Sequence, residues 1–306
     1  MSIVVVGSIN VDVTGYLDRL PRPGETLHGE RYTIGLGGKG ANQAAAAARL
    51  GGAVTMIGRV GNDPFGDTAL DVLGTFGVDT ASVRRDTTNA TGIALIGVDR
   101  QGENMIVVVG GTNMALDDSD IERTRTQFET AKVLLTQREI PAGITRLAAE
   151  RARAAGAIAV HDPAPAPAGG LRDEALEAFD IVTPNESETE ALVGFRPDNE
   201  ADAKRAAQAL MARGARIAIV KLGARGVYVA GPNVDLFIPP FRVASVDSVA
   251  AGDCFNGGLA DALARGLKLV EAVRFAAACG ALATTRYGAA ASAPTRAEVE
   301  TLLARS

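Results

Sequence analysis

The amino-acid sequence predicts a three-layer α/β/α protein with a mainly parallel central sheet and a small β-sheet lid. Apolar strand-like runs alternate with helix-like segments of about 10–15 residues, which is typical of right-handed βαβ units. The continuous apolar run Ile3–Val6 suits a strand covered on both faces. Residues 13–36 and 91–109 instead alternate in short runs, which indicates a separate antiparallel sheet.

The composition fits one folded domain. Of the 306 residues, 47% are hydrophobic and 22% are charged, and the 35 glycines allow close contact between helices and sheets. The formal net charge of −5 provides no basic footprint, which argues against nucleic acid or a membrane surface as a partner. We therefore expect a single domain over residues 1–306, with the lid formed from about residues 13–36 and 91–109.

The cysteine content and the first residues favour a reducing cytoplasm. Cys254 and Cys279 form no CxxC motif and no disulfide framework. Residues 1–6 are too short and too uncharged for a signal peptide. No apolar run reaches the roughly 18 residues that a membrane-spanning helix needs.

The first half of the chain combines the start of the main sheet with both lid segments. Strand Ile3–Val6 ends in a polar turn, and an Ala-rich stretch over residues 38–50 has strong helix propensity. Residues 92–98 and 104–109 alternate around a polar turn, which predicts a hairpin that pairs with residues 13–36. The other elements expected here are strand Val54–Arg59, helix Asp67–Phe76 and strand Ala81–Arg85.

From about residue 117 onward, helices and strands alternate regularly, which predicts a parallel sheet with helices on both faces. The predicted helices are Asp118–Gln127, Ile144–Ala155, Glu186–Val193, Glu200–Arg213, Gly252–Arg265 and Leu269–Tyr287. The predicted strands are Val133–Thr136, Ala157–His161, Ile181–Thr183, Ile217–Lys221, the hairpin Val227–Ala230 with Asp235–Ile238, and Phe241–Val246.

The sharpest chemical signal is the segment Asp247–Phe255, in which small residues turn the chain into a helix. Small side chains leave the amides of Ala250, Ala251 and Gly252 exposed at the positive end of that helix, where they can bind an anion. A carboxylate at Asp253 would accept the proton of a hydroxyl that attacks a phosphoryl group. The spacing fits an ordinary acidic residue at a helix start equally well.

The second signal is the glycine-rich segment Gly37–Ala44. It is not a Walker A motif, and it does not follow a strand as a dinucleotide-binding GxGxxG would. Lys39 and Asn42 lie three residues apart on one helix face and supply donors for hydroxyl groups. A plain glycine-rich helix entry is the alternative.

The third signal is Asn10 with Asp12 after the first strand. Ligands of open α/β sheets bind beyond the carboxyl ends of the strands, where such side chains can hold vicinal hydroxyls. Asn and Asp are also common in turns for local backbone reasons, so this signal is weak alone.

These segments, in this order, resemble the PfkB, or ribokinase-like, family of carbohydrate kinases. The first signature of that family is similar to Gly37–Ala44 and the second to Asp247–Leu259, and the resemblance runs through essentially the whole chain. Further similar pieces are Gly110–Asn113, Asp162–Ala166, Thr183–Glu188 and Lys221–Gly226. The resemblance implies a ribokinase-like fold and ATP-dependent phosphorylation of a sugar hydroxyl, with D-ribose as the expected sugar and D-ribose 5-phosphate as the product.

The resemblance also implies a role for each matching residue. Asp253 would be the general base, and the backbone at Ala250, Ala251 and Gly252 would form the anion hole. The residues expected to hold the sugar are Asn10, Asp12, Gly38, Lys39, Asn42, Glu139 and Asp253. The residues expected at the nucleotide are Asn185, Glu188, Lys221, Leu222, Gly223, Ala224, Arg225, Gly226, Gly252 and Ala277.

The resemblance also implies two metal ions and a homodimer. Asn185 and Glu188 match an Asn-x-x-Glu element associated with ATP phosphates and Mg²⁺, and a homodimer would form through the lid. A monovalent cation, usually K⁺, is expected at Asp247, Val249, Ala283, Arg286, Gly288 and Ser292.

The chain departs from the family pattern in three places, one of which is a pair of residues. Lys221 stands where Thr is frequent, and as a cation it would meet a phosphate or form a solvated strand end. His161 and Asp162 replace an apolar-Asn pair, which puts details of the nucleotide site in doubt. Arg138 precedes Glu139 where an apolar residue is usual, so a preferred sugar other than ribose stays open.

Other functions remain open from the sequence. A related kinase for fructose, deoxyribose or 2-keto-3-deoxygluconate is the nearest alternative. A nucleoside kinase is disfavoured because the lid has no aromatic cluster to hold a base. A sugar- or nucleotide-binding regulator without catalysis is disfavoured because Asp253 and Gly252 are both present.

Overall fold

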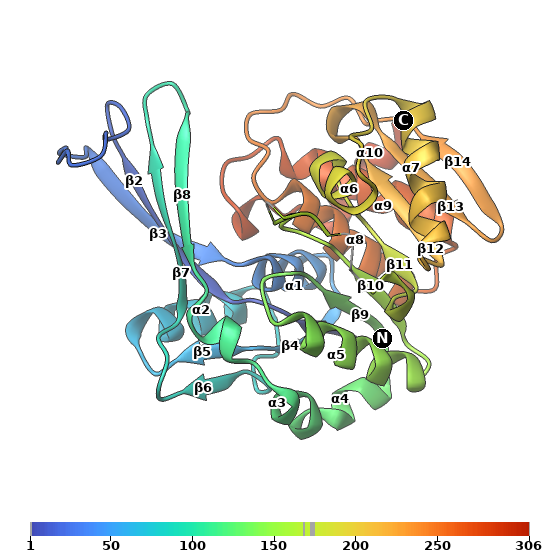
Figure 1. The fold of residues 1–306 in the computed structure, drawn as a ribbon, viewed down its shortest axis with the longest axis horizontal. Helices are drawn as coiled ribbons and strands as arrows, with labels where there is room; N and C mark the ends of the chain where they lie inside the picture. The colour runs from blue at the N-terminus through green and yellow to red at the C-terminus, as the bar shows by residue number, and fades with distance from the viewer. Residues whose placement is uncertain (1, 168, 172–174, 306) are drawn as a thin grey trace.

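The computed structural model describes residues 2–167, 169–171 and 175–305. Within them the chain forms an eight-stranded large sheet, a four-stranded small sheet and a two-stranded ribbon (Figure 1). The small sheet stands at one side of the molecule, next to the end of the large sheet that carries β1 and β4. No helix among the described residues has the length and apolar character needed to cross a membrane.

The large sheet has the order β14-β13-β12-β11-β10-β9-β1-β4. Neighbouring strands are parallel from β4 to β12, and β13 and β14 add an antiparallel edge. Its strands are β1 (Ser2–Val6), β4 (Ala53–Ile57), β9 (Ala131–Thr136), β10 (Ile158–His161), β11 (Ile181–Val182), β12 (Ile217–Lys221), β13 (Val227–Gly231) and β14 (Val234–Ile238).

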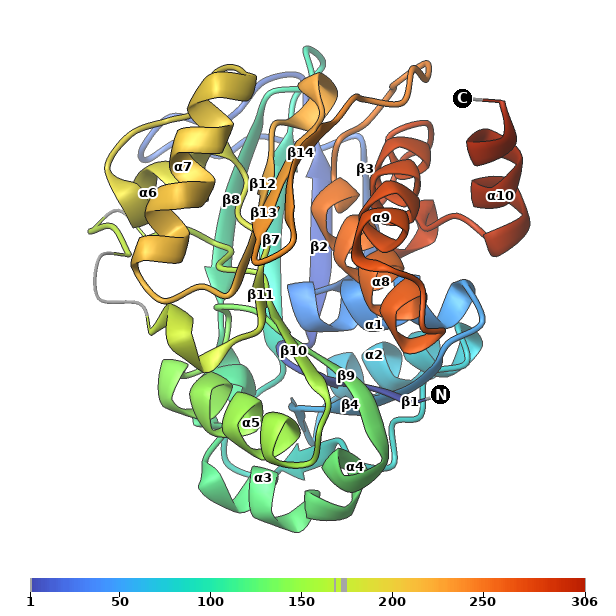
Figure 2. The ribbon, with the colours of Figure 1, turned by 90° about the vertical axis from the view of Figure 1, so that its right-hand side faces the viewer.

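Helices cover both faces of the large sheet because successive strand residues point to opposite sides. In β1, Ile3 and Val5 pack into one apolar cluster, whereas Val4 and Val6 pack into another. Figure 2 shows helices on both sides of the sheet. The helices of the first cluster are α1 (Lys39–Arg49), α2 (Pro64–Thr75), α8 (Ala251–Ala264), α9 (Leu269–Ala283) and α10 (Arg296–Ala304). Those of the second are α3 (Asp118–Arg123), α4 (Arg125–Thr130), α5 (Ala142–Ala154), α6 (Glu186–Val193) and α7 (Glu200–Ala212).

The small sheet joins two distant segments in the order β3-β2-β7-β8, as the sequence predicts. β2 runs antiparallel to β3 and parallel to β7, and β7 and β8 form the expected hairpin. Its strands are β2 (Asn10–Tyr16), β3 (Arg31–Gly37), β7 (Gly92–Val98) and β8 (Asn104–Val109). The ribbon pairs β5 (Arg59–Gly61) with β6 (Arg84–Asp86), and the 3-10 turns are η1 (Gly111–Ala115), η2 (Leu176–Ala178), η3 (Gly223–Arg225) and η4 (Ala290–Ser292).

The predicted fold class is confirmed, but several boundaries in the first half differ, and α2 begins at Pro64 rather than Asp67. The strand expected over residues 54–59 divides at Gly58, where a Cβ would lie 2.9 Å from the carbonyl oxygen of Gly7. The strand expected over residues 81–85 lies at Arg84–Asp86, because it pairs with β5. The helix expected over residues 118–127 divides at Thr124, whose hydroxyl donates to the Asp120 carbonyl at 2.8 Å.

The second half differs near the carboxyl terminus. Residues 241–246 form no strand, because the Val246 amide donates to the Thr284 carbonyl at 2.7 Å instead of entering a ladder. α9 ends at Ala283 rather than Tyr287, since the hydroxyls of Thr284 and Thr285 donate to carbonyls of its last turn. Helix α10 is absent from the prediction, although the capping box that begins it can be read in the sequence.

Candidate active site

Five adjacent strands carry the candidate site residues beyond their carboxyl ends. β1, β9, β10, β11 and β12 are parallel, so these ends meet at one edge of the large sheet. The chain reaches Asn10 after β1, Glu139 after β9, Asp162 after β10 and Asn185 after β11, and β12 ends at Lys221. Ligands of open α/β sheets bind at this edge.

Helices α1 and α8 begin at the same edge and pack closely side by side. A Cβ on Gly257 of α8 would lie 2.7 Å from the Cβ of Ala46 of α1, so only glycine permits this distance. The contact brings two amide side chains of α1 to the start of α8. Asn42 Nδ2 lies 3.3 Å from Asp253 Oδ2, and Gln43 Nε2 donates to Asp253 Oδ1 at 3.1 Å.

Asp253 occupies the first turn of α8 with a side chain that is almost completely buried. The residue before the helix, Ala250, adopts a left-handed conformation with φ of 56°, the single non-glycine with positive φ in the described chain. An alanine in this region costs about 1 kcal/mol, and such strain concentrates at functional sites. The turn directs the first amides of α8 toward the carboxyl edge of the sheet.

The surroundings of Asp253 suit a proton acceptor. Burial raises the pKa of its carboxyl above the usual range. The positive charge of Lys39 lowers this pKa, whereas the negative charges of Asp162 and Glu139 raise it. A carboxylate with a raised pKa is a stronger base than an exposed one, which general base catalysis requires.

The expected sugar residues gather beside Asp253. Glu139 Oε2 accepts hydrogen bonds from Ser8 Oγ at 2.6 Å and from the Lys39 amide at 2.9 Å. Burial, followed by the charges of Glu139 and Asp253, raises the pKa of Asp12 to about 6. Burial opposes the charge on Lys39, but the surrounding carboxylates, led by Asp253, raise its pKa overall.

The conformation of Gly38 and the hydrogen bonds of Asn10 explain why these two residue types stand beside the expected sugar site. Gly38 has φ of 84°, and a Cβ there would lie 2.8 Å from the Asn10 amide nitrogen. Asn113 of η1 donates from Nδ2 to Asn10 Oδ1 at 2.6 Å, and its own Oδ1 accepts from the Ile9 amide at 2.9 Å. Because Oδ1 of Asn10 accepts this bond, its Nδ2 remains the group that would donate to a ligand.

The expected nucleotide residues lie next to Asp162. At the start of α6, Asn185 Oδ1 accepts from the Glu188 amide at 2.9 Å, and Glu188 Oε2 accepts from the Asn185 amide at 2.8 Å. Burial first, and Asp162 second, raise the pKa of Glu188. The Lys221 amide donates to the Pro184 carbonyl at 2.9 Å, which joins β12 to this corner.

Part of the expected nucleotide loop after Lys221 is exposed to solvent. Leu222 is buried, whereas Gly223, Ala224 and Arg225 are exposed on η3. The Arg225 guanidinium pairs with Glu186 at 2.9 Å. Gly226 is buried like Leu222, and Ala277 is half-buried on α9.

The residues expected around a monovalent cation lie on two adjoining segments, residues 247–249 and 283–292. The Asp247 carboxylate accepts from the Val249 amide at 3.0 Å and from the Gly288 amide at 3.2 Å. Ser292 Oγ donates to the Ala289 carbonyl at 2.8 Å, whereas Arg286 forms an ion pair with Glu298. Ala283 is buried at the end of α9. Within the described residues, no three His, Cys, Asp or Glu side chains cluster as metal ligands.

Comparison with known proteins assigns the chain to a family. The family model described as "pfkB family carbohydrate kinase" matches residues 1–296. The chain belongs to the pfkB family of carbohydrate kinases. It is therefore a phosphotransferase that acts on a sugar hydroxyl.

The chain is similar to named relatives along its whole length. It is 40% identical over 297 residues to a ribokinase of Haemophilus influenzae, with 97% of this chain and 96% of the relative covered. It is 33% identical over 297 residues to a deoxyribokinase of Salmonella typhimurium, with 96% of each covered. The structure of Arabidopsis thaliana ribokinase complexed with ribose and ATP superposes with a TM-score of 0.89, 33% identity and 98% of each chain covered.

Three buried residues of this pfkB family member were not singled out from the sequence as site residues. Gln43 Nε2 donates to Asp162 Oδ2 at 3.0 Å as well as to Asp253, and Gln137 Nε2 donates to Gln43 Oε1 at 2.7 Å. Gln43 lies within the first family signature, and Asp162 is the first residue of another segment that matches the family. The sequence therefore contained a signal for each of these two residues. Gln137 carries no such signal.

Two of the departures from the family pattern have structural explanations. His161 is buried and stacks on Phe179 with ring centroids 4.2 Å apart, so it packs the core rather than facing a nucleotide. Asp162, the next residue, enters the site instead. Nothing in the structure explains the choice of Arg138.

Proposed function

We propose that the protein is a ribokinase, which converts ATP and D-ribose to ADP and D-ribose 5-phosphate. The observation that carries the proposal is the setting of Asp253, a buried carboxylate with a raised pKa at the amino end of α8. Asn42 and Gln43 hold it beside the backbone of residues 250–252, where a phosphoryl group would bind. The similarity to ribokinases supports ribose as the sugar.

In this proposal Asp253 is the general base. The proton of the ribose 5-hydroxyl passes to a carboxylate oxygen of Asp253 as the hydroxyl oxygen bonds to the γ-phosphorus of ATP. The bond from that phosphorus to the β,γ-bridging oxygen breaks, and ADP leaves. The amides of Ala250, Ala251 and Gly252 act as the anion hole that stabilises the charge on the transferred group.

The sugar would bind on the side of Asp253 that faces away from the transferred phosphoryl group. Glu139, Asp12 and Asn10 offer carboxylate and amide groups at one corner, with Lys39 and Asn42 opposite them on α1. Gly38 lets the ligand approach the backbone closely. Several fixed donors and acceptors of this kind suit a small ligand with many hydroxyls.

We place the nucleotide at Asn185, Glu188, Lys221–Gly226, Gly252 and Ala277. Mg²⁺ bound with ATP would offset the charge of the phosphates. Glu188 and Asp162 fit this ion because they place two acidic groups together, and both oxygens of Glu188 are oriented by Asn185. Mg²⁺ retains several waters in most protein sites, so contact through water suits such a carboxylate.

We place K⁺ at Asp247, Val249, Ala283, Arg286, Gly288 and Ser292. Carboxylate and carbonyl oxygens are hard donors, which suit K⁺ rather than a transition metal. The bond from the Gly288 amide to Asp247 joins the two segments just before the anion hole, and the bond from Val249 fixes the turn at Asp247. A cation there would fix the conformation of Ala250 and the amides after it.

We further propose a single domain with the small sheet as its lid, a homodimer formed through that lid, and a cytoplasmic location. The lid proposal rests on the position of Asn10 and Asp12, which belong to β2 and also line the sugar corner. Closure over ribose would exclude water and limit hydrolysis of ATP.

A deoxyribokinase is the second candidate, because a curated deoxyribokinase is also similar over almost the whole chain. The two candidates differ in the 2-hydroxyl of the sugar. A site that hydrogen-bonds this hydroxyl rejects the deoxy sugar because a buried polar group is then left unpaired.

A panel of sugars at fixed ATP and Mg²⁺ tests the assignment through kcat/KM. We expect ribose to exceed deoxyribose, fructose and 2-keto-3-deoxygluconate by at least about tenfold, or about 1.4 kcal/mol of transition-state stabilisation. A tenfold preference for any of the other sugars would contradict the ribokinase assignment and leave the phosphotransferase chemistry intact.

A further inference from the structure

Lys221 places a buried positive charge at the centre of the site. It is the last residue of β12, and 9% of its surface is exposed. Its Nζ lies 3.3 Å from Asp162 Oδ1 and 5.7 Å from the centroid of the Phe255 ring. Phe255 belongs to the first turns of α8, so the ammonium group faces the amino end of that helix.

The distance to Gly252 defines where the ammonium group lies. A Cβ built on Gly252 would be 3.6 Å from Lys221 Nζ. Gly252 supplies one of the amides at the start of α8, next to Asp253. The charge of Lys221 is therefore adjacent to the proposed anion hole, unlike Arg225 of the same loop, which pairs with Glu186 at the surface.

The pairing with Asp162 does not satisfy all of the N–H donors of the Lys221 ammonium group. An ammonium has three N–H donors, and Asp162 is the one acceptor within hydrogen-bond distance of Nζ among the described residues. Taking a charge pair out of water costs several kcal/mol unless further hydrogen bonds satisfy both partners. Asp162 gains such a partner in Gln43, whereas Lys221 retains N–H donors beyond the one that Asp162 accepts, and its Nζ lies beside Gly252.

We infer that Lys221 is a catalytic residue, which donates a hydrogen bond to the phosphoryl group while that group moves from ATP to the sugar. The inference rests on the proposed function and deepens it, because it assigns this side chain to the γ-phosphoryl oxygens rather than to the border of the nucleotide. Charge on these oxygens is what a fixed cation stabilises in phosphoryl transfer.

Asp162 and Gln43 are then positioning residues. Lys221 contacts Asp162 at 3.3 Å, Asp162 accepts from Gln43 at 3.0 Å, and the same Gln43 nitrogen donates to Asp253 at 3.1 Å. A continuous set of contacts thus joins the cation at the phosphoryl group to the base at the hydroxyl. Both reacting ends are held by one side chain of α1.

The test replaces Lys221 by Met, which keeps length and removes charge, and by Arg, which keeps charge. We expect kcat to fall about 10²–10³-fold in Lys221→Met, the range for loss of one transition-state donor, with partial recovery in Lys221→Arg. The KM for ribose should stay within about twofold, since no sugar contact is lost. Lys204→Met is the matched control, because Lys204 of α7 is exposed and pairs with Asp235 of β14.

Calorimetry adds a readout that does not depend on turnover. With ribose present, binding of ADP plus aluminium fluoride, which mimics the phosphoryl group in transfer, should weaken about 100-fold in Lys221→Met. Binding of ADP alone should change less than about threefold. Equal losses for the two ligands, or an unchanged kcat, would overturn the inference and reduce Lys221 to a nucleotide contact or a core ion pair.

Two controls separate the role of Lys221 from misfolding of the variant and from failure of the proposed function. If circular dichroism shows that Lys221→Met does not fold, Lys221→Ala removes the same charge and donor with a smaller side chain, and the same expectations apply to it. A wild-type protein that phosphorylates no sugar would contradict the proposed function itself. An active wild type with a fully active Lys221 variant would contradict the role of Lys221 alone.

Discussion

At the scale of single residues, the site is a set of carboxylates kept close together by amides and two lysines. Asp253, Asp12 and Glu188 all have pKa values raised mainly by burial, with neighbouring carboxylates adding to the effect. Such crowding destabilises the protein, and perturbed pKa values of this kind concentrate at functional sites.

Asp12 gives the clearest pH dependence. Its pKa is raised from 3.8 to about 6, so the folded protein binds this proton more tightly than the unfolded chain. The free energy of unfolding should therefore fall as the pH rises from about 4 to about 6. Asp12→Asn removes this loss, and we expect it to stabilise the protein by about 1–2 kcal/mol at pH 7.5 and by nothing at pH 4.

Urea unfolding of wild type and Asp12→Asn at the two pH values measures this difference, with Asp71→Asn on the exposed face of α2 as the control for lost charge. The same protonation should raise the KM for ribose below about pH 6, because a protonated Asp12 accepts hydrogen bonds poorly. A wild type that gains stability over this pH range relative to Asp12→Asn would show that Asp12 is not strained by its neighbours.

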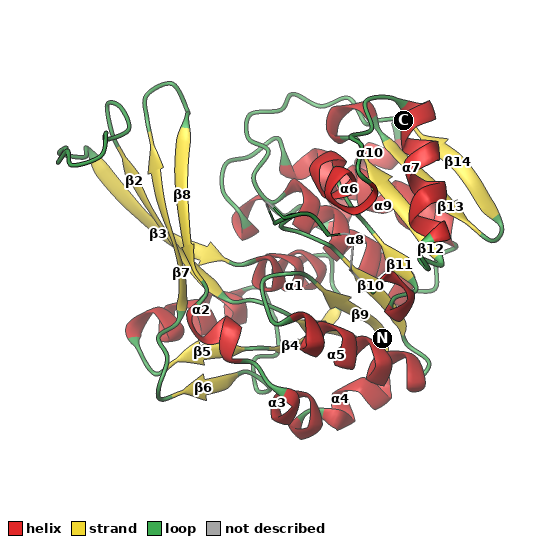
Figure 3. Ribbon diagram, in the orientation of Figure 1, coloured by secondary structure: helices red, strands yellow, loops and turns green. Residues whose placement is uncertain are grey.

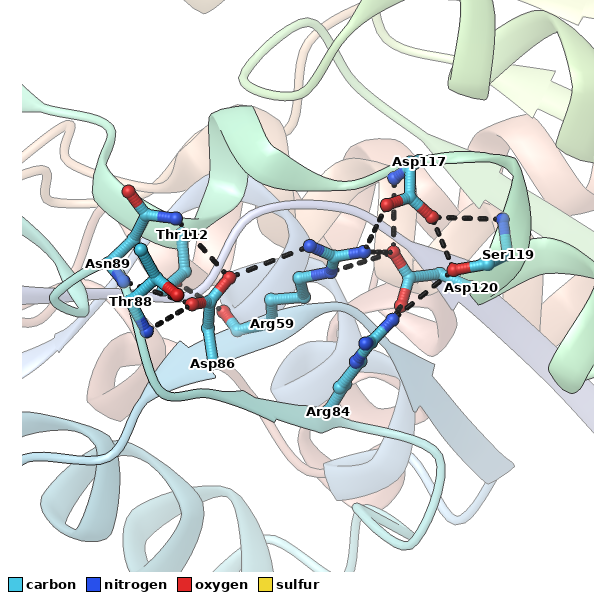
Figure 4. Close-up of polar contacts among 9 residues, drawn as sticks. All are labelled: Arg59, Arg84, Asp86, Thr88, Asn89, Thr112, Asp117, Ser119 and Asp120. Carbon is cyan, nitrogen blue, oxygen red and sulfur yellow. Dashed lines mark hydrogen bonds and ion pairs between the residues drawn. The ribbon is translucent and has the colours of Figure 1, made fainter.

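At the scale of elements, a buried ion-pair network connects the ribbon to α3 and the base of the small sheet. Figure 4 shows Arg59 between Asp86 on one side and Asp117 with Asp120 on the other. Asp120 is fully buried and also contacts the more exposed Arg84 at 3.7 Å. The carbonyl of Arg59 accepts from Thr112 in η1, which leads directly to Asn113 and Asn10.

Removing Arg59 should be costly because it leaves buried Asp120 without its main partner. We expect Arg59→Met to lower the free energy of unfolding by about 3–5 kcal/mol, as for other broken buried pairs. Arg84→Met, which removes a half-exposed partner of the same carboxylate, should cost below about 1 kcal/mol. Equal losses in urea unfolding of the two variants would contradict the account of this network.

The sequence predicts helices and strands well where their positions depend on neighbouring residues alone. The uniform apolar character of Ile3–Val6 and the glycine pair after α1 are properties of neighbouring residues, and both predictions are confirmed. The missing strand at 241–246 depends on a long-range contact, in which the Val246 amide donates to the carbonyl of Thr284 just after α9. No pattern within either segment reveals that contact.

At the scale of the whole molecule, the small sheet exposes an apolar row on one face. Ile34, Val13, Leu95 and Val107 are register partners across its four strands. Three of these side chains, Ile34, Leu95 and Val107, are 46–49% exposed, and Figure 3 shows the outer part of the sheet standing clear of the helices. A contiguous exposed apolar row of this kind marks an interaction surface, which supports the proposed homodimer.

Charged substitutions in that row test the dimer. We expect Leu95→Lys and Val107→Lys to convert a dimer to a monomer in analytical ultracentrifugation, because each would bury a charge between apolar surfaces. Val270→Lys on α9 is the control, since Val270 is exposed but lies outside the small sheet. A monomeric wild type, or a dimer that persists in both variants, would contradict the proposal.

The order of elements was predictable along almost the whole chain, but the site was predictable only in part. Motif resemblance indicated Asp253, Asn42 and Lys39, and these groups do lie together. Gln43 stayed hidden because it contacts Asp162 and Asp253, which are 119 and 210 positions away. Its role depends on how closely α1 packs against α8, a property of the tertiary structure.

The account depends most on Asp253 as the base that activates the sugar hydroxyl. Asp253→Asn keeps the shape of the side chain but removes its capacity to accept a proton. Single-turnover phosphorylation of ribose should slow at least about 10³-fold, while calorimetry should show ribose bound within about threefold of wild-type affinity. Phosphorylation within tenfold of the wild-type rate would contradict the account.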